Sequence, residues 1–311
     1  MATPTDRVLS IDALRPLQAR SDAQGAARLG LHCVLLGAAG WLVAVAPGWW
    51  VLPSMFVLGL IQVALFAPAH ETMHQTAFRS RRANAVVGWL TACPSLLNWH
   101  FYTSFHLAHH RHTQIAGLDP ELAVPEPVSL RGYLLRVAGV PFWTLRLRVV
   151  RDCWRGDLLA YPYIAPKDAP TIIRSVRAMS VLMFGGAAVS AAIFGWQAPF
   201  LYWIIPQLIG QPPLRAYLLA EHTGCTLDRN GLTNTRTTLT NAAVRLLMWN
   251  MPYHAEHHLY PSIPFHQLAD AHKAIRDRLS FVQPGYLRWN AGLVRGLALP
   301  TQQGPRGDQA I

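Results

Sequence analysis

Hydrophobic and polar residues alternate along the chain in long blocks. Apolar runs almost without charge cover residues 29–46, 49–69, 177–195 and 199–219. Each is close to the roughly 20 residues that a helix needs to cross a bilayer. Short turns join the first run to the second and the third to the fourth. The pattern predicts an all-α integral membrane protein whose four transmembrane helices form two hairpins.

The segments around these runs divide the chain into three parts. Residues 1–27 form a polar N-terminal segment, residues 28–280 the membrane domain, and residues 281–311 a C-terminal tail. The N-terminal segment lacks the short apolar core and cleavage site of a signal peptide. Residues 300–311 are rich in polar residues and are expected to be disordered.

Two stretches between the runs predict interfacial helices. Residues 86–97 are apolar but too short to span a bilayer, which predicts an interfacial or re-entrant helix. In residues 131–155, Arg alternates with Leu, Val, Phe and Trp, which is typical of a helix lying on an anionic membrane surface. The alternative for this second stretch is an ordinary solvated helix.

Composition and charge also favour a membrane protein. Only 14% of the residues are charged, against roughly a quarter in soluble domains. The net charge of +11 could suggest nucleic-acid binding, but Lys and Arg are absent from both hairpin tips. By the positive-inside rule, both termini and the polar segments are therefore cytoplasmic, and the basic residues contact membrane lipids rather than nucleic acid. Nearly all 27 basic residues are Arg, which favours a GC-rich bacterial genome and an inner membrane.

Three clusters of His follow the apolar runs. They read HETMH at residues 70–74, HLAHH at 106–110 and HAEHH at 254–258. At these spacings the rings share one helix face, and imidazole suits Fe, Cu and Zn. A single His rarely binds metal, but such dense clustering predicts a metal centre. With the His that ends the fourth run, the candidate ligands are His70, His74, His106, His109, His110, His222, His254, His257 and His258.

The fourth run carries a polar stripe. Gln207, Gln211 and Arg215 follow one another at i+4, and Pro212-Pro213 is expected to bend or break the helix. Polar groups within a bilayer tend to face a cavity, so the stripe is a candidate substrate passage in which Arg215 meets an acidic headgroup or carboxylate. The alternative is that these side chains hydrogen-bond to neighbouring helices.

The three boxes, with the phrases HLAHHRHTQ and NMPYHAEHHLYPSIP, resemble the membrane fatty acid desaturase superfamily over about residues 30–280. The phrases are most similar to its bacterial desaturase-type branch; the superfamily also includes hydroxylases and carotenoid ketolases. The resemblance implies two non-haem Fe ions held by the nine His at the cytoplasmic end of the helices, with O2 as co-substrate. It implies oxidation of an unactivated C–H bond in a lipid, with desaturation of a fatty acyl chain as the leading hypothesis and hydroxylation or ketolation as the alternative. Electrons would come from an external donor of ferredoxin, rubredoxin or cytochrome b5 type.

Residues around the ligands are expected to orient them, because ligating imidazoles usually donate their other N–H to a carboxylate or carbonyl. The candidates are Glu71, Asp119, Asn250 and Glu256, while His112 is expected either to lie around the ligands or to face the substrate. Leu218 stands where some desaturases carry an Asn one turn before the His that corresponds to His222. His100 is assigned to an interface or to this outer layer, and purely structural roles are expected for His32, His266 and His272.

Two functions of other classes also fit a His-rich membrane protein. A metal transporter would place its ligands near the bilayer midplane, whereas these clusters lie at the ends of the apolar runs. A membrane hydrolase would hold zinc through imidazoles, and nine His exceed the needs of one zinc but not of two. The four Cys are scattered without a CxxC pair, so they indicate neither a disulfide framework nor a thiolate zinc site.

Overall fold

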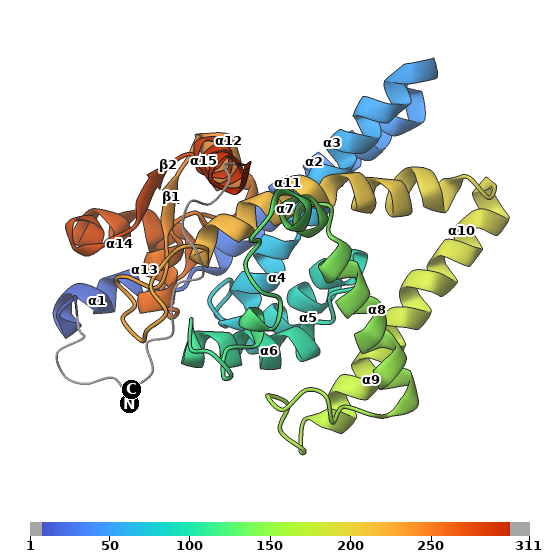
Figure 1. Cartoon of the computed structure of the whole chain (residues 1–311). Coiled ribbons are helices and arrows are strands. Elements are labelled where there is room, and N and C mark those ends of the chain that lie inside the picture. Colours follow the sequence, from blue (N-terminus) through green and yellow to red (C-terminus); the bar gives the residue numbers. More distant parts are fainter. Residues whose placement is uncertain (1–7, 299–311) are drawn as a thin grey trace.

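The first long helices of the protein lie side by side. The computed structural model describes residues 8–298, beginning with α1 (Ile11–Leu17) and α2 (Asp22–Val45). A 3-10 turn, η2 (Gly48–Trp50), leads into α3 (Val51–Ala64), and α4 (Phe66–Met73) follows directly. In Figure 1, α2 and α3 project together from the body of the molecule. The buried ring of His32 joins them, because its Nε2 lies 2.8 Å from the carbonyl oxygen of Ile61.

The stretch after the first His box forms two helices that pack beside α4. These are α5 (Arg81–Ala92), continued by η3 (Cys93–Ser95), and α6 (Trp99–His112). Leu96 adopts a left-handed conformation (φ 49°), which reverses the chain between them. The side chain of Asn98 caps α6 by accepting a hydrogen bond from the backbone N–H of Phe101.

The predicted basic helix over residues 131–155 is two helices. After η4 (Pro120–Ala123), the chain forms α7 (Leu130–Val137) and α8 (Val140–Arg155). Gly139 separates them at φ +79°, a conformation that glycine adopts at little cost. The prediction of one continuous surface helix is therefore wrong. Arg146, which lies in α8, is also buried rather than exposed on the surface.

The third apolar run belongs to a longer helical stretch made of α9 (Ala169–Ser180), the π-helical η5 (Val181–Gly185) and α10 (Gly186–Phe194). The fourth comprises the π-helical η6 (Phe200–Ile204) and α11 (Ile205–His222). Figure 1 shows α10 and α11 diverging from the turn that joins them, while α11 packs along α3. Pro212 and Pro213 lie inside α11, which continues to His222, so the expected break is absent.

Two glycines allow the close crossing of α3 and α11. A Cβ atom on Gly59 would lie 2.3 Å from the carbonyl oxygen of Pro206, and one on Gly210 would lie 2.5 Å from that of Gly59. Real Cβ atoms do not approach backbone oxygens so closely, so side chains at these positions would force the helices apart. Because α11 ends at His222, the distance between α3 and α11 also affects the position of His222 relative to the other His residues.

Three helical segments among the described residues are long and apolar enough to cross a membrane: Asp22–Val45, Gly48–Met73 and Ala169–Phe194. Large apolar side chains are exposed along them, including Trp41 (63%) and Phe194 (76%). An exposed apolar band of this kind marks a lipid or protein contact. The fourth predicted span is helical but less apolar, because Gln207, Gln211 and Arg215 lie in it.

The C-terminal part combines short helices with a small sheet. Its helices are α12 (Ala242–Leu247), α13 (His254–Leu259), η7 (Phe265–Gln267), α14 (Leu268–Ile275), η8 (Arg276–Arg278) and α15 (Tyr286–Ala298). Strand β1 (Thr237–Leu239) pairs in parallel with β2 (Val282–Pro284), with Thr237 opposite Val282.

This sheet and the last helix differ from the sequence prediction. The fold is predominantly helical, but β1 and β2 make it not purely α. Residues assigned to the C-terminal tail include β2 and α15, and α15 packs against α11 and α7. Residues 300–311, which were expected to be disordered, lie outside the described residues.

Candidate metal centre

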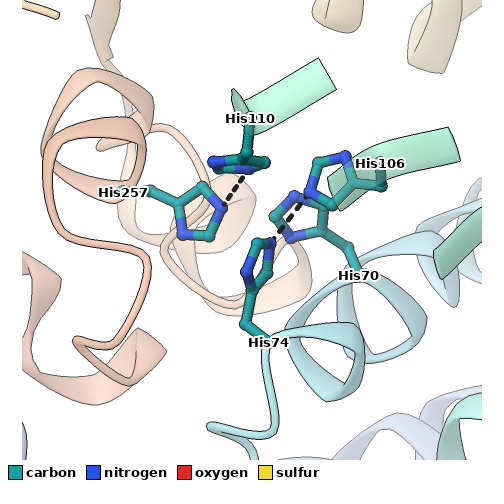
Figure 2. A group of neighbouring side chains, drawn as sticks. All are labelled: His70, His74, His106, His110 and His257. Atoms are coloured by element: carbon teal, nitrogen blue, oxygen red, sulfur yellow. Dashed lines mark hydrogen bonds between the residues drawn. The ribbon is translucent and has the colours of Figure 1, made fainter. Parts of the chain in front are cut away.

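Four helices bring the His clusters together. His70 lies on α4 and His74 caps its end, the second box ends α6, the third forms α13, and His222 is the last residue of α11. One group contains five rings, His70, His74, His106, His110 and His257, whose nearest nitrogens all lie within 4.8 Å of one another. Figure 2 shows these rings converging on one point. A second group contains His109, His222 and His258 under the same limit.

The ninth predicted ligand, His254, lies beside the second group rather than in it. Its Nε2 atom is 3.2 Å from Nε2 of His222 and 3.5 Å from Oε2 of Glu221. Eight of the nine predicted ligands thus fall into two groups, and His254 is adjacent to one of them.

The spacing of the ring nitrogens fits bound metal ions. Nε2 of His74 lies 2.9 Å from Nε2 of His106, and Nε2 of His110 lies 3.2 Å from Nε2 of His257, as the dashed lines in Figure 2 mark. Two nitrogens about 2.1 Å from one ion, at about 90–100° to each other, are separated by about the same distances. Both ring nitrogens of His70, and Nε2 of His258, are buried without a hydrogen-bond partner within the described residues. An ion would bind the lone pair that each of these two neutral rings offers.

The rings of the second group are each oriented through Nδ1. His109 donates from Nδ1–H to Asp119 at 2.9 Å, and His222 donates to the backbone carbonyl of Asn234 at 3.1 Å. His258 faces the hydroxyl of Thr113 at 3.3 Å, and that hydroxyl donates to the backbone carbonyl of His109. With Nδ1 occupied in this way, the Nε2 lone pair of each ring is left for a metal.

Burial keeps most of these imidazoles neutral. Burial, together with the nearby His109, lowers the pKa of His74 to about 3. Burial and neighbouring imidazoles also lower the pKa values of His106, His110 and His257 well below the ordinary value. Neutral rings offer the lone pairs that metal binding requires. His109 differs, because the carboxylates of Glu121 and Asp119 outweigh the effect of burial and raise its pKa.

The predicted orienting residues have different surroundings. Of these residues, Asp119 alone has a side chain that hydrogen-bonds an imidazole of the two groups, as far as the described residues go. Glu71 accepts from the backbone N–H of Phe265, and Asn250 donates to the carbonyl of the same residue. The side chain of Glu256 pairs with His272 and Thr237. His112 belongs to neither group of rings.

These contacts give the two acidic residues and Asn250 a bracing role around α13. Glu256 joins the third box to α14 and β1, whereas Glu71 joins α4 to η7 and Asn250 joins the loop before α13 to η7. Thr113 and Glu221 contact site imidazoles but were not singled out from the sequence. Nothing in the local pattern marked Thr113, whereas Glu221 was visible as an acidic residue next to a candidate ligand.

A cavity of about 400 Å³ opens beside the His groups. His70, His106, His109 and His254 form part of its wall. The apolar lining includes Phe66, Leu97, Phe105, Phe142, Leu218 and Met251. Leu218, at the position where some desaturases carry Asn, thus presents an apolar group to the cavity.

The predicted substrate stripe separates into two kinds of residue. Arg215 lines the cavity. Gln207 accepts a hydrogen bond from Ser95 at 3.0 Å, and its amide lies 3.4 Å from the side-chain oxygen of Gln62, so it joins helices. Gln211 is fully buried and is not part of the cavity wall. Gln207 therefore follows the helix-bonding alternative, Arg215 lies at a cavity wall, and the side-chain amide of Gln211 has no hydrogen-bond partner within the described residues.

Comparison with known proteins places the chain among desaturases. A family described as "Fatty acid desaturase" matches residues 12–290. The chain is 26% identical to dihydrorhizobitoxine desaturase of Bradyrhizobium elkanii over 277 residues, covering 83% of this chain and 77% of that protein. It is 23% identical to sphingolipid delta(4)-desaturase DES1 of Drosophila melanogaster over 78% of this chain and 70% of the relative. It is 22% identical to sn-1 oleoyl-lipid 12-desaturase of Picosynechococcus over 76% and 72%.

The family match covers the helices, the His boxes and the cavity together. It does not fit the metal transporter and zinc hydrolase that the sequence left open. The apolar helices agree with a membrane location. The chain belongs to the fatty acid desaturase family and is an oxidoreductase.

Proposed function

We propose that the protein uses two non-haem Fe ions and O2 to desaturate an aliphatic chain in a lipid substrate. The observation that carries the proposal is the division of the imidazoles into two neighbouring groups beside one cavity. Two groups of imidazole nitrogen donors suit two divalent transition-metal ions.

The nine His residues named above are assigned as the ligands. The five-ring group would hold one ion, and His109, His222 and His258 the other, with His254 reaching the second group next to His222. When bound, a di-iron centre supplies the oxidant that removes hydrogen from an unactivated C–H bond. The protein holds the imidazoles in place and keeps the reacting carbon atoms next to them.

The chain's own residues control where the substrate lies. Phe66, Leu97 and Met251 provide an apolar wall that positions the hydrocarbon and limits the access of water. Asp119 and Thr113 hold the rings of His109 and His258 in one orientation. Desaturation requires that two adjacent carbons be presented in turn, whereas hydroxylation or ketolation requires one.

The proposed membrane placement follows from charge and apolar surface. We place α2, α3–α4, α9–α10 and α11 across a bacterial inner membrane, with the His groups and both termini on the cytoplasmic side. Within the polar stripe of α11, the amide of Gln207 contacts Gln62 of α3, which reduces the cost of its place in the bilayer, and Arg215 faces the cavity. An external electron donor of ferredoxin, rubredoxin or cytochrome b5 type would dock on the cytoplasmic face.

The test is mass spectrometry of lipids from an aerobic host that expresses the protein, compared with a host that expresses His258→Ala. Loss of two hydrogens from an acyl species in the first host alone would support desaturation. Gain of one oxygen would assign hydroxylation or ketolation to the same site.

Metal analysis of the two purified proteins accompanies this comparison. The wild type should contain about two Fe per chain, and His258→Ala should contain less. Zinc in place of iron, with no lipid change when iron and a reductant are supplied, would contradict the proposal.

A further inference from the structure

The cavity beside the His groups contains charged residues that an acyl chain alone does not require. Its wall includes the guanidinium groups of Arg136, Arg146 and Arg215 and the carboxylates of Glu121 and Glu221. A site for an uncharged hydrocarbon would bury apolar groups here instead, because unpaired charge is costly to bury.

Two of these arginines share one aromatic ring. The guanidinium carbon of Arg215 lies 4.2 Å from the ring centre of Phe142, and that of Arg146 lies 5.1 Å from it. Arg146 also lies 5.6 Å from the ring centre of Tyr102. These contacts hold both cations at the cavity wall, but an aromatic face accepts few of the five N–H bonds that each guanidinium offers.

Neither arginine has an anionic partner within the part of the chain that the structure describes. Arg146 is only 5% exposed, and the Nε atoms of Arg146 and Arg215 are buried without a hydrogen-bond acceptor within residues 8–298. No carboxylate in that part of the chain lies within 4.0 Å of either guanidinium. Arg136 differs, since it donates to the carbonyl of Val124 at 3.1 Å.

We infer that the cavity binds a substrate bearing a carboxylate or phosphate, and that Arg146 and Arg215 hold this anionic group. A guanidinium fork matches the two oxygens of such a group. The inference rests on the proposed function, because it takes the cavity to be the substrate site of the desaturase.

The two carboxylates give the bound substrate a direction. Glu121 lies 3.8 Å from Nδ1 of His109, and Glu221 lies 3.5 Å from Nε2 of His254, so both acidic side chains lie at the His end of the cavity. Arg215 precedes His222 by seven residues on α11, or about 10 Å along a helix. That end of the cavity offers an anion no guanidinium, so the acidic group lies at the arginines and the hydrocarbon extends toward the His groups.

The experiment measures binding to the full-length protein, as purified with its metal, in phosphatidylcholine nanodiscs. Octanoate is the probe for a free carboxylate, and methyl octanoate is its uncharged counterpart. We expect octanoate to raise Tm and to bind at least tenfold more tightly than the ester. Arg215→Gln and Arg146→Gln should each weaken octanoate binding roughly ten- to a hundredfold.

Arg131→Gln is the matched control, because Arg131 is an exposed arginine of α7 that does not line the cavity. It should bind octanoate like the wild type. Arg215→Lys keeps the charge and should retain part of the affinity. If a Gln variant fails to fold, the preference of the wild type for acid over ester still tests the inference.

Nanodiscs containing phosphatidate distinguish the source of the anion. If a lipid phosphate occupies the arginines, phosphatidate should raise Tm and compete with octanoate; if a free acid does, phosphatidate should leave octanoate binding unchanged. Equal affinity for octanoate and its methyl ester, or unchanged octanoate binding in both folded Gln variants, would overturn the inference. Iron content and the His258→Ala lipid comparison are measured separately, so failure of the proposed chemistry is recognised independently of this binding result.

Discussion

Asp119 and His109 form a buried hydrogen-bonded pair: Nδ1–H of the imidazole donates to the two carboxylate oxygens at 2.9 and 3.0 Å. The carboxylate is itself held by the backbone N–H groups of Gln114 and Glu121. A turn of the chain directly after the second His box therefore fixes the orientation of one candidate ligand.

Replacement of Asp119 by Asn should weaken metal binding. The amide removes the negative charge that favours the Nδ1–H tautomer, and loss of such a partner commonly costs roughly 10- to 100-fold in metal affinity. Retention of iron during dialysis against a chelator measures the effect. Asp270→Asn is the control, because Asp270 is an exposed residue paired with Lys273 on α14. Equal iron retention in Asp119→Asn and wild type would show that the pair does not support the ligand.

The two His residues around the end of the second box should behave differently. His109→Ala removes one imidazole from the group formed by His109, His222 and His258, and it should lower iron content by about one ion per chain. His112→Ala should leave iron content near that of the wild type, because His112 belongs to neither group. Elemental analysis of both variants decides the matter, and an equal loss of iron from each would mean that the grouping is wrong.

Acid should destabilise the metal-free protein. The pKa of His74 is lowered from 6.5 to about 3 in the fold, so between these values the unfolded chain binds a proton that the folded site does not. Stability is therefore present above pH 6.5 and is lost as the pH falls, by about 2 kcal/mol at pH 5 for this residue.

The measurement is Tm of the chelator-treated protein from pH 7.5 to 5, with the iron-loaded protein alongside. Bound metal should raise Tm at each pH. His74→Gln, which has no titrating ring, should show a shallower decline. A Tm of the metal-free protein that rises on acidification would contradict the expected sign.

A side chain at the crossing of α3 and α11 should disturb the fold and the site together. Gly59→Val places atoms against the backbone of Pro206 and should cost about 1–3 kcal/mol or more. Thermal unfolding and iron content measure the two effects. Gly37→Val on α2 is the control, since a Cβ there meets nothing within 4 Å. If both variants unfold at the same temperature, the close approach does not limit the packing.

Local patterns in the sequence were sufficient to predict the helices that carry the candidate ligands. Intervals of three and four residues within each box put its rings on one face of a helix wherever that helix lies. The apolar runs predicted the long helices for a similar reason, since burial in lipid requires continuous apolar length. Asp119 was also within reach of such reasoning, because it follows the second box closely in the chain.

Other features depended on contacts between distant segments. Arg146 has the pattern of a surface arginine in an amphipathic stretch, yet it is buried against Tyr102 and Phe142. Thr113 orients His258, which is 145 residues away in the chain. No local period records either relationship.

The sequence by itself determined that the chain is a helical, His-rich member of this family with three His boxes, each on a single helix or at its end. Only the tertiary structure decided how the imidazoles divide into two groups, that His254 lies beside His222, and that Arg146 and Arg215 line the same cavity. The physical reason is that side-chain spacing along a helix is set by its own geometry. The position of one helix against another is set by packing, as at Gly59 and Gly210, which the order of residues does not display.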